Sequence, residues 1–375
     1  MATIPFSIEF IVFVLFSVSF IILLFYYLFI FRRFAYHKKK STPLAGAMPV
    51  TIVIAAKNEE DNLQKNLPYI LNQDYSEFEV IVVNDFSTDD TEALLEQFQA
   101  LYSNFRAITI KQEANNTTGK KYPLTLGIKG AKYECILLTD ADCGPKSNKW
   151  ISKMVENYDN NIEVVLGYGA YEKKSGFLNK LIRFDTFFIA LQYFSHALSG
   201  NPYMGVGRNL FYKKDLFFKH KGFAKHTHIA SGDDDLFIGK VANKQNTTIA
   251  YAHESHTVSK VKSSLKSWTR QKRRHMTTGK FYKAKTKFSL GGLAVSNFIF
   301  ILTFVALILF NYQIYLIGMV FIVKLSIQLS IFKQSMEKLG EKDLLVYSPV
   351  LELFLIFYYP YLYFSNTFIK QSRWK

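Results

Sequence analysis

The stretch CILLTDAD, residues 135–142, decides how the middle of this chain folds. Its first four residues form a short apolar run that is typical of a buried strand, and its second half supplies the carboxylates of Asp140 and Asp142. Ligands of open α/β sheets bind at the carboxyl ends of strands, where two carboxylates can hold a hard divalent cation. The alternative is a strand that ends in a solvated Asp turn, and the motif alone leaves both interpretations open.

Strand and helix patterns alternate on both sides of this stretch. Runs rich in β-branched residues occupy residues 50–55, 80–84 and 105–110, and helical patterns occupy residues 59–73, 89–101 and 120–132. This alternation predicts an α/β domain, at residues 48–280, whose mostly parallel sheet is covered by helices on both faces. An aromatic helix at residues 177–198 is expected to lie either in the core of this domain or in the headgroup region of a membrane.

The amino-terminal part of the chain is apolar enough to cross a membrane. Residues 6–31 carry a single charged side chain, Glu9. About 20 helical residues span the hydrocarbon core of a bilayer, and this apolar run is too long for a signal peptide. We therefore predict a retained transmembrane anchor at residues 1–34.

A second apolar region follows the middle domain. Residues 289–311 and 313–332 predict two further transmembrane helices. Residues 345–369 are broken by Pro349 and Pro360, so they are either a third crossing or an interfacial segment. The region 289–369 is thus predicted to contain two or three spans.

The formal net charge of this 375-residue chain is +16, and its basic residues cluster beside the apolar regions. No aromatic-interleaved basic face accompanies them, so we expect contacts with anionic membrane lipids and none with nucleic acid. Basic loops stay on the cytoplasmic side of a membrane. The cluster that begins at Arg32 and Arg33 therefore predicts a cytoplasmic middle domain, and we expect an integral protein of a bacterial inner membrane.

Further carboxylates lie at the predicted strand ends and helix starts. Asp85 ends the second strand ahead of the residues that cap the next helix, so capping does not require it. The segment SGDDDLF, residues 231–237, predicts a helix after a glycine turn, with Asp233, Asp234 and Asp235 in its first turn. Acidic residues there also favour the helix dipole, so a structural role for them is the alternative.

Six motifs follow one another along the middle domain: AAKNEE (55–60), VVNDFSTDD (82–90), LLTDAD (137–142), GVGRN (205–209), SGDDDLF (231–237) and QKRRH (271–275). With these motifs the chain resembles the membrane-bound family 2 glycosyltransferases, of the cellulose-synthase-like or N-acetylglucosaminyltransferase-like kind. The resemblance covers nearly the whole middle domain. It implies the GT-A fold, a Rossmann-like sheet that binds nucleotide-diphospho-sugars, with transmembrane helices on both sides.

Carried over by position, the resemblance implies that Ala55 and Glu59 line the nucleoside pocket. It places Asp85 at the base or ribose and Lys120 near the nucleotide. Asp140 and Asp142 match the family's DxD motif. Asp142 would be the direct ligand of Mg²⁺ or Mn²⁺, and Asp140 would lie nearer the ribose or sugar while sharing the metal.

For the reaction itself, the resemblance implies that Asp233 is the catalytic base, with Asp234 as second choice. QKRRH matches the family's QxxRW, so Arg274 would meet the pyrophosphate and Gln271 would help to close the site. His275 stands where the family usually has Trp, which puts an acceptor-stacking platform in doubt. Arg208 and Asn209 follow a glycine turn where the family borders its acceptor site.

The function implied is an inverting, metal-dependent transfer of sugar from a cytosolic UDP- or GDP-sugar to a lipid, lipid-linked or polysaccharide acceptor. A sugar nucleotidyltransferase-like enzyme is one alternative, but it needs a glycine-rich phosphate loop where this chain has AAKNEE. A non-catalytic membrane scaffold is the other. That alternative predicts losses among the carboxylates, yet all of them are present: Asp85, Asp140, Asp142 and Asp233.

Overall fold

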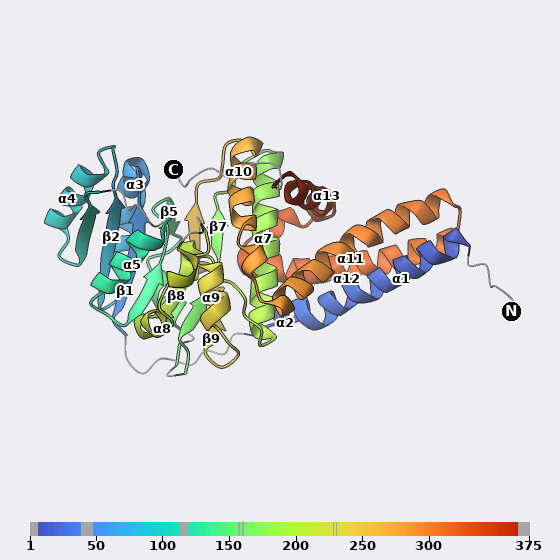
Figure 1. Ribbon diagram of the computed structural model, residues 1–375, viewed down its shortest axis with the longest axis horizontal. Coiled ribbons are helices and arrows are strands. Elements are labelled where there is room, and N and C mark those ends of the chain that lie inside the picture. The colour runs from blue at the N-terminus through green and yellow to red at the C-terminus, as the bar shows by residue number, and fades with distance from the viewer. Residues whose placement is uncertain are drawn as a thin grey trace.

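The computed structural model describes residues 7–38, 48–112, 119–156, 158–159, 161–227, 229 and 231–366. An α/β domain forms one end of the molecule, and long helices from both ends of the sequence form a bundle at the other end (Figure 1). The predicted α/β domain is confirmed, and candidate membrane helices lie on both sides of it in the sequence.

A seven-stranded sheet forms the centre of the α/β domain. Its order is β3 (Phe105–Ile110), β2 (Phe78–Asp85), β1 (Val50–Ala56), β4 (Cys135–Leu138), β8 (Leu210–Lys213), β6 (Val164–Leu166) and β9 (Thr247–Ile249). Only β8 runs opposite to its neighbours, so the sheet is mostly parallel, as predicted. Every residue of β1 is buried, which is the pattern of a parallel strand covered on both faces.

Helices cover the two faces of this sheet, because alternate side chains of a strand point to opposite faces. Ile52 and Ile54 belong to the core under α3 and α4, whereas Val53 belongs to the core under α5. The helices on the first face are α3 (Glu60–Leu71), α4 (Thr91–Leu101) and α6 (Trp150–Val155). Those on the second face are α5 (Lys121–Gly130), α7 (Phe177–Leu198), α8 (Lys214–Lys219) and α9 (Asp235–Val241).

A small second sheet begins directly after Asp142. It has the order β5 (Cys143–Pro145), β10 (Thr257–Ser259) and β7 (Gly169–Tyr171). Helix α10 (Leu265–Met276) follows β10. Short 3₁₀ turns complete the domain: η2 (Gly207–Asn209), η3 (Ala224–His226), η4 (His253–Ser255) and η5 (Gly279–Phe281). The small sheet thus connects the DxD loop to the helix that carries QKRRH.

Helix α7 lies at the junction between the α/β domain and the bundle. Most of its side chains are buried, so of the two predicted environments the structure favours the core. Arg183 of α7 is almost fully buried and donates to Glu341, with Nε 3.0 Å from Oε2. A buried ion pair also joins Asp185 of α7 to Lys272 of α10. Removing one partner of such a pair leaves an uncompensated charge, so these contacts hold the junction in one arrangement.

Three helical segments in the described part of the chain are long and apolar enough to cross a membrane. The first, residues Ile8–Ala35, comprises α1 (Ile8–Phe25), the π-helix η1 (Tyr26–Phe31) and α2 (Arg32–Ala35). The others are α11 (Ala284–Leu309) and α12 (Ile314–Leu339). Asn311 and Gln313 have positive φ angles and lie in the short turn between α11 and α12.

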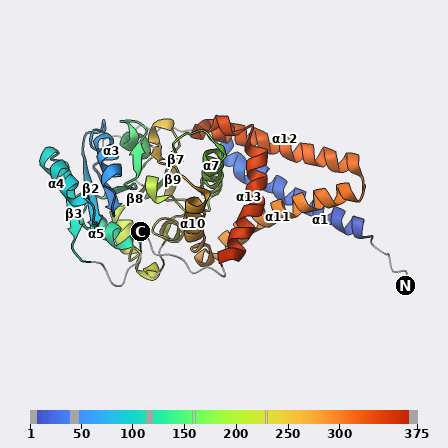
Figure 2. The same cartoon turned by 90° about the horizontal axis from the view of Figure 1, so that it is seen from above.

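The last helix, α13 (Ser348–Asn366), follows the 3₁₀ turn η6 (Lys342–Leu344) and is not among these three segments. It runs across the direction of α11 and α12 (Figure 2). Its exposed apolar side chains recur at helical spacing: Val350, Leu353, Phe357, Tyr361 and Phe364. For residues 345–366 the structure therefore favours the interfacial alternative over a further crossing, and the last three residues of the predicted segment 345–369 lie outside the described residues.

The expected break at the two prolines of this segment does not occur. Pro349 lies in the first turn of α13, where the missing backbone N–H would have no helical partner in any case. Pro360 lies inside the helix, which continues to Asn366. The start of α13 is held by Glu352, which accepts hydrogen bonds from Gln328 at 2.5 Å and from Tyr27 at 3.3 Å.

Candidate active site

The loops after β1 and β2 are joined to each other by hydrogen bonds. The Asn58 backbone N–H donates to Ser87 Oγ at 2.9 Å, and the Thr88 N–H donates to Asn58 Oδ1 at 2.8 Å. The Glu59 N–H donates to Thr91 Oγ1 at 3.2 Å. The residues after β2 therefore do more than begin the next helix, because they fix the position of the AAKNEE loop.

The three residues predicted to surround the nucleoside lie at these neighbouring strand ends. Asp85 is the last residue of β2 and is half-buried. Glu59 is also half-buried and accepts a hydrogen bond from Asn62 at 2.5 Å. The methyl group of Ala55 is buried in the core and only 4% of the residue is exposed. Ala55 can thus line a pocket through its backbone rather than its side chain.

Asp140 lies among positive charges. Lys120 Nζ is 2.6 Å from Asp140 Oδ1. Burial would raise the pKa of Asp140, but Lys120, followed by two guanidinium groups, outweighs burial and lowers this pKa. The guanidinium groups belong to Arg208 and Arg274. The structure therefore brings Lys120, Arg208 and Arg274 to the DxD loop from three separate elements.

Lys120 also connects the DxD motif with the acidic segment that precedes α9. Burial would lower the pKa of Lys120, but Asp140, followed by Asp142, raises it. A weaker contribution in the same direction comes from Asp233. One ammonium group is thus within electrostatic range of both the predicted metal ligands and the predicted base. The neighbouring Lys121 donates to the carbonyl groups of Ile229 and Ser231, which holds the approach to that segment.

The DxD carboxylates fit a divalent metal. Ligand atoms of Asp140, Asp142 and Cys143 lie within 4.8 Å of one another. Carboxylate oxygens are the ligands that Mg²⁺ and Mn²⁺ prefer. The Cys143 thiol is buried and donates to Asp142 Oδ1 at 3.4 Å, and burial followed by the two carboxylates raises its pKa well above the usual value. The donor set is therefore two carboxylates, with the thiol protonated behind them.

The three consecutive aspartates are in different environments. Helix α9 begins at Asp235, so the prediction that all three lie in its first turn is wrong. Asp234 is the N-cap and accepts hydrogen bonds from the backbone N–H groups of Asp235 at 2.7 Å and Gly207 at 2.8 Å. Asp235 is buried and accepts hydrogen bonds from Thr278 and, at 2.6 Å, from Tyr282. Asp234 and Asp235 thus support the local structure.

Asp233 differs from its two neighbours. Within the described ranges, no side chain or backbone N–H donates a hydrogen bond to its carboxylate. Burial, followed by the charges of Asp233 and Asp235, raises the pKa of Asp234 to about 8. A raised pKa at Asp234 is expected where several carboxylates are crowded together in a buried place.

Helix α10 brings two incompletely satisfied polar groups to the site. Arg274 Nε and Gln271 Oε1 are buried, and neither has a hydrogen-bond partner in the part of the chain that the structure describes. Buried polar atoms are normally paired, so these groups are suited to a ligand. Loss of hydration around the imidazole, followed by the positive charges of Arg274 and Lys272, lowers the pKa of His275 well below its usual value. His275 is therefore neutral at physiological pH.

Arg208 and Asn209 are adjacent in sequence but have different environments. The Arg208 guanidinium lies 4.4 Å from the ring centroid of Tyr171, a cation–π contact. Asn209 is fully buried, accepts a hydrogen bond from Trp150 at 3.0 Å and donates to Tyr168 at 2.9 Å. The structure thus gives Asn209 a structural role, and only Arg208 of the predicted acceptor pair can meet a substrate.

Two overlapping family models match this chain. Residues 51–221 match the model described as glycosyl transferase family 2, and residues 152–330 match that described as glycosyl transferase family group 2. Together they cover more than half of the chain. The chain belongs to glycosyl transferase family 2. This membership agrees with the DxD loop, the acidic segment and the basic helix brought together above.

Relatives of this glycosyltransferase include bacterial polysaccharide synthases. Poly-beta-1,6-N-acetyl-D-glucosamine synthase of Staphylococcus epidermidis is 30% identical over 162 residues, which is 42% of this chain and 37% of the relative. The synthase of the same name from Staphylococcus aureus (strain MSSA476) is 28% identical over 151 residues, 40% of this chain and 35% of the relative. The matches thus span little more than a third of the relatives' length.

One solved structure aligns with nearly the whole chain. It is a mannosyltransferase from Pyrobaculum calidifontis in complex with GDP-Man and Mn²⁺. The likeness has a TM-score of 0.59 at 17% identity and covers 92% of this chain and 99% of the other. It confirms the GT-A fold.

The sequence of this glycosyltransferase did not indicate two contributors to the site. Tyr171, which stacks on Arg208, lies in a strand of only three residues with no pattern of its own. Cys143 adjoins Asp142, but no metal-type cysteine spacing in the sequence marks it as part of a site. The position of Cys143 directly after the DxD motif was the one signal in the sequence that could have placed it in the site.

Gly169 tests how the glycosyltransferase positions Arg208. A Cβ atom at Gly169 would overlap Arg208 Nε, so Gly169→Ala must displace this side chain from Tyr171. We expect roughly a tenfold or greater loss of transfer rate, because small displacements of positioning groups are costly, with little change in unfolding temperature. Steady-state kinetics and thermal melting measure the two effects. Gly279→Ala, where nothing lies within 4 Å, is the matched control, and equal rates for both variants would contradict the proposed positioning.

Proposed function

We propose that this protein is a metal-dependent, inverting glycosyltransferase that moves a sugar from a UDP- or GDP-sugar to an acceptor at a membrane. The observation that carries the proposal is the position of Lys120, which pairs with Asp140 and is within electrostatic range of Asp142 and Asp233. A diphosphate held at the DxD loop would therefore lie close to the proposed base.

The donor would bind along the carboxyl ends of the parallel strands. Ala55, Glu59 and Asp85 would surround the nucleoside. Lys120, Arg274 and Gln271 would meet the diphosphate, for which the unpaired Arg274 Nε and Gln271 Oε1 are suitable. Asp140 and Asp142 would hold Mg²⁺ or Mn²⁺, which when bound neutralises charge on the diphosphate oxygens.

The reaction would be a single displacement. Asp233 accepts the proton of the acceptor hydroxyl as that oxygen forms a bond to the anomeric carbon. The bond between this carbon and the diphosphate oxygen breaks, and its electron pair leaves with the nucleoside diphosphate. Attack from the face opposite the leaving group inverts the anomeric configuration. Arg208, beside Asp140, would border the acceptor and stabilise the departing charge.

The acceptor would be a lipid, a lipid-linked sugar or a growing polysaccharide. The three candidate membrane helices and the exposed apolar face of α13 would hold the site at the surface of a bilayer. The basic residues after the first helix would place the α/β domain on the cytoplasmic side of a bacterial inner membrane. The polysaccharide synthases among its relatives make an N-acetylglucosamine donor the first to test.

Purified full-length protein is expected to release nucleoside diphosphate from one sugar in a panel of UDP- and GDP-sugars. Release should depend on Mg²⁺ or Mn²⁺ and should rise when extracted membrane lipid is added, because the acceptor is then present. A coupled nucleotide assay measures this release. No release from any donor, with lipid and both metals present, would contradict the proposed function.

A further inference from the structure

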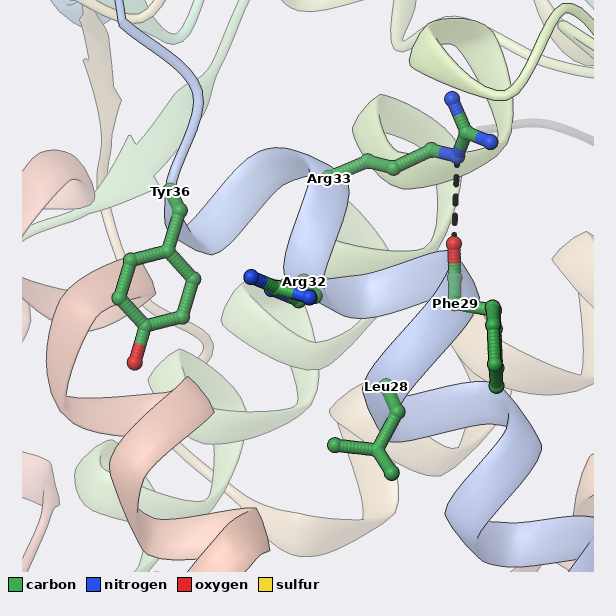
Figure 3. Close-up of a pocket in the computed structure, with 5 residues that line it drawn as sticks. All are labelled: Leu28, Phe29, Arg32, Arg33 and Tyr36. Carbon is green, nitrogen blue, oxygen red and sulfur yellow. Dashed lines mark hydrogen bonds between the residues drawn. The ribbon is translucent and has the colours of Figure 1, made fainter.

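A groove lies where the first candidate membrane helix meets the α/β domain. Its volume is about 340 Å³, and its lining residues are Leu28, Phe29, Arg32, Arg33 and Tyr36 (Figure 3). All five are exposed. The groove belongs to no part of the proposed catalytic site, because its residues come only from η1, α2 and the residue that follows.

The groove is apolar at one end and cationic at the other. Leu28, Arg32 and Tyr36 follow one another at a spacing of four residues, and Phe29 and Arg33 form a parallel pair, so each apolar side chain lies one turn before an arginine. Residues Tyr26–Phe31 form a π-helix, a rare element that often occurs at functional sites. The wider turn of the π-helix changes the direction in which the side chains from Arg32 onward project from the helix axis.

The two arginines have no acidic partner. No ion pair to Arg32 or Arg33 occurs in the described ranges, and the one side-chain hydrogen bond of Arg33 goes from Nε to the Phe29 carbonyl at 3.2 Å. Tyr36 fixes the far end of the groove, since its hydroxyl is 3.2 Å from Ser330 Oγ of α12. Two guanidinium groups therefore remain available to a ligand of opposite charge.

We propose that this groove binds one anionic phospholipid, with its phosphate between Arg32 and Arg33 and its acyl chains along Leu28 and Phe29. Guanidinium groups bind phosphate through several N–H donors at once. The apolar end continues onto the exposed apolar face of α1, which includes Val18, Ile21 and Phe25. A soluble phosphate would use only the cationic end, so the shape and chemistry of the groove fit a lipid.

Native mass spectrometry of the full chain in neutral detergent tests the proposal, using phosphatidylglycerol and phosphatidylcholine with identical acyl chains. We expect one phosphatidylglycerol to bind at least about tenfold more tightly than phosphatidylcholine, because basic residues near an anionic headgroup each strengthen binding. Arg32→Gln/Arg33→Gln should remove this preference. Arg32→Lys/Arg33→Lys should keep most of it, since the charge is retained, and tests the site if the first variant fails to fold.

Lys129→Gln/Lys219→Gln is the matched control, because it removes two exposed charges from α5 and α8, away from the bundle (Figure 1). Its lipid preference should equal that of the unmodified chain. The proposal is overturned if the control loses the preference equally, if the Arg32→Gln/Arg33→Gln variant keeps it, or if inorganic phosphate displaces the lipid at millimolar concentration. None of these measurements requires sugar transfer, so they stand apart from the proposed activity.

Discussion

Asp233→Asn is expected to lower the rate of sugar transfer by roughly 10²- to 10⁴-fold, the range typical of losing a general base. The amide has the shape of the carboxylate but cannot accept the proton of the acceptor hydroxyl. Folding should be unaffected, because no described residue donates a hydrogen bond to the Asp233 carboxylate. Turnover is measured by nucleotide release with acceptor, and donor affinity by calorimetry should change little.

The neighbouring aspartates supply controls that separate chemistry from structure. Asp235→Asn disturbs the acceptor of the Thr278 and Tyr282 hydroxyl groups, so it should lower the unfolding temperature. Asp234→Asn keeps an oxygen for the Gly207 N–H and should cost less activity than Asp233→Asn. If Asp234→Asn abolished transfer while Asp233→Asn left it intact, the base would be Asp234, the second choice from the sequence.

Asp142→Asn is expected to lower transfer by roughly 10²-fold or more, because a neutral amide binds Mg²⁺ or Mn²⁺ more weakly than a carboxylate does. The concentration of Mn²⁺ needed for half-maximal rate should rise, and excess metal should restore part of the activity. Titration of the rate with Mn²⁺ measures both effects. A purely structural role for Asp142 would lower the rate without moving this concentration.

Two further measurements serve as controls for this prediction. Asp215→Asn removes an exposed carboxylate from α8 and should leave the metal requirement unchanged. Exhaustive chelation of the unmodified protein should abolish transfer. Full activity after chelation would remove the metal role of both Asp140 and Asp142.

The elements of the α/β domain could be predicted where local pattern and tertiary environment agree. The strand at residues 105–110 matches β3, and the helix at residues 177–198 has the same bounds as α7. The sequence also predicted that Asp140, Lys120 and Arg274 would meet, although they come from separate elements. That prediction came from the family resemblance, since no local pattern reports a contact between distant segments.

The start of α9 and the course of the last helix could not be predicted. Asp234 turns its side chain back onto the Asp235 N–H, and this choice of N-cap among three identical residues depends on Gly207 from another loop. Pro360 was expected to break the last apolar segment. A helix tolerates an internal proline when neighbouring packing supports it, and α13 packs against α7, α10 and α11.

The packing of α13 against α10 joins the last described helix to the helix that carries Arg274. Tyr358 of α13 stacks on Trp268 at 5.1 Å between ring centroids and lies 2.6 Å from Thr269 Oγ1, while Ser365 accepts a hydrogen bond from Arg273 at 3.0 Å. Glu352 ties the other end of α13 to α12. These contacts tie the position of α10, and of Arg274 with it, to the position of α13.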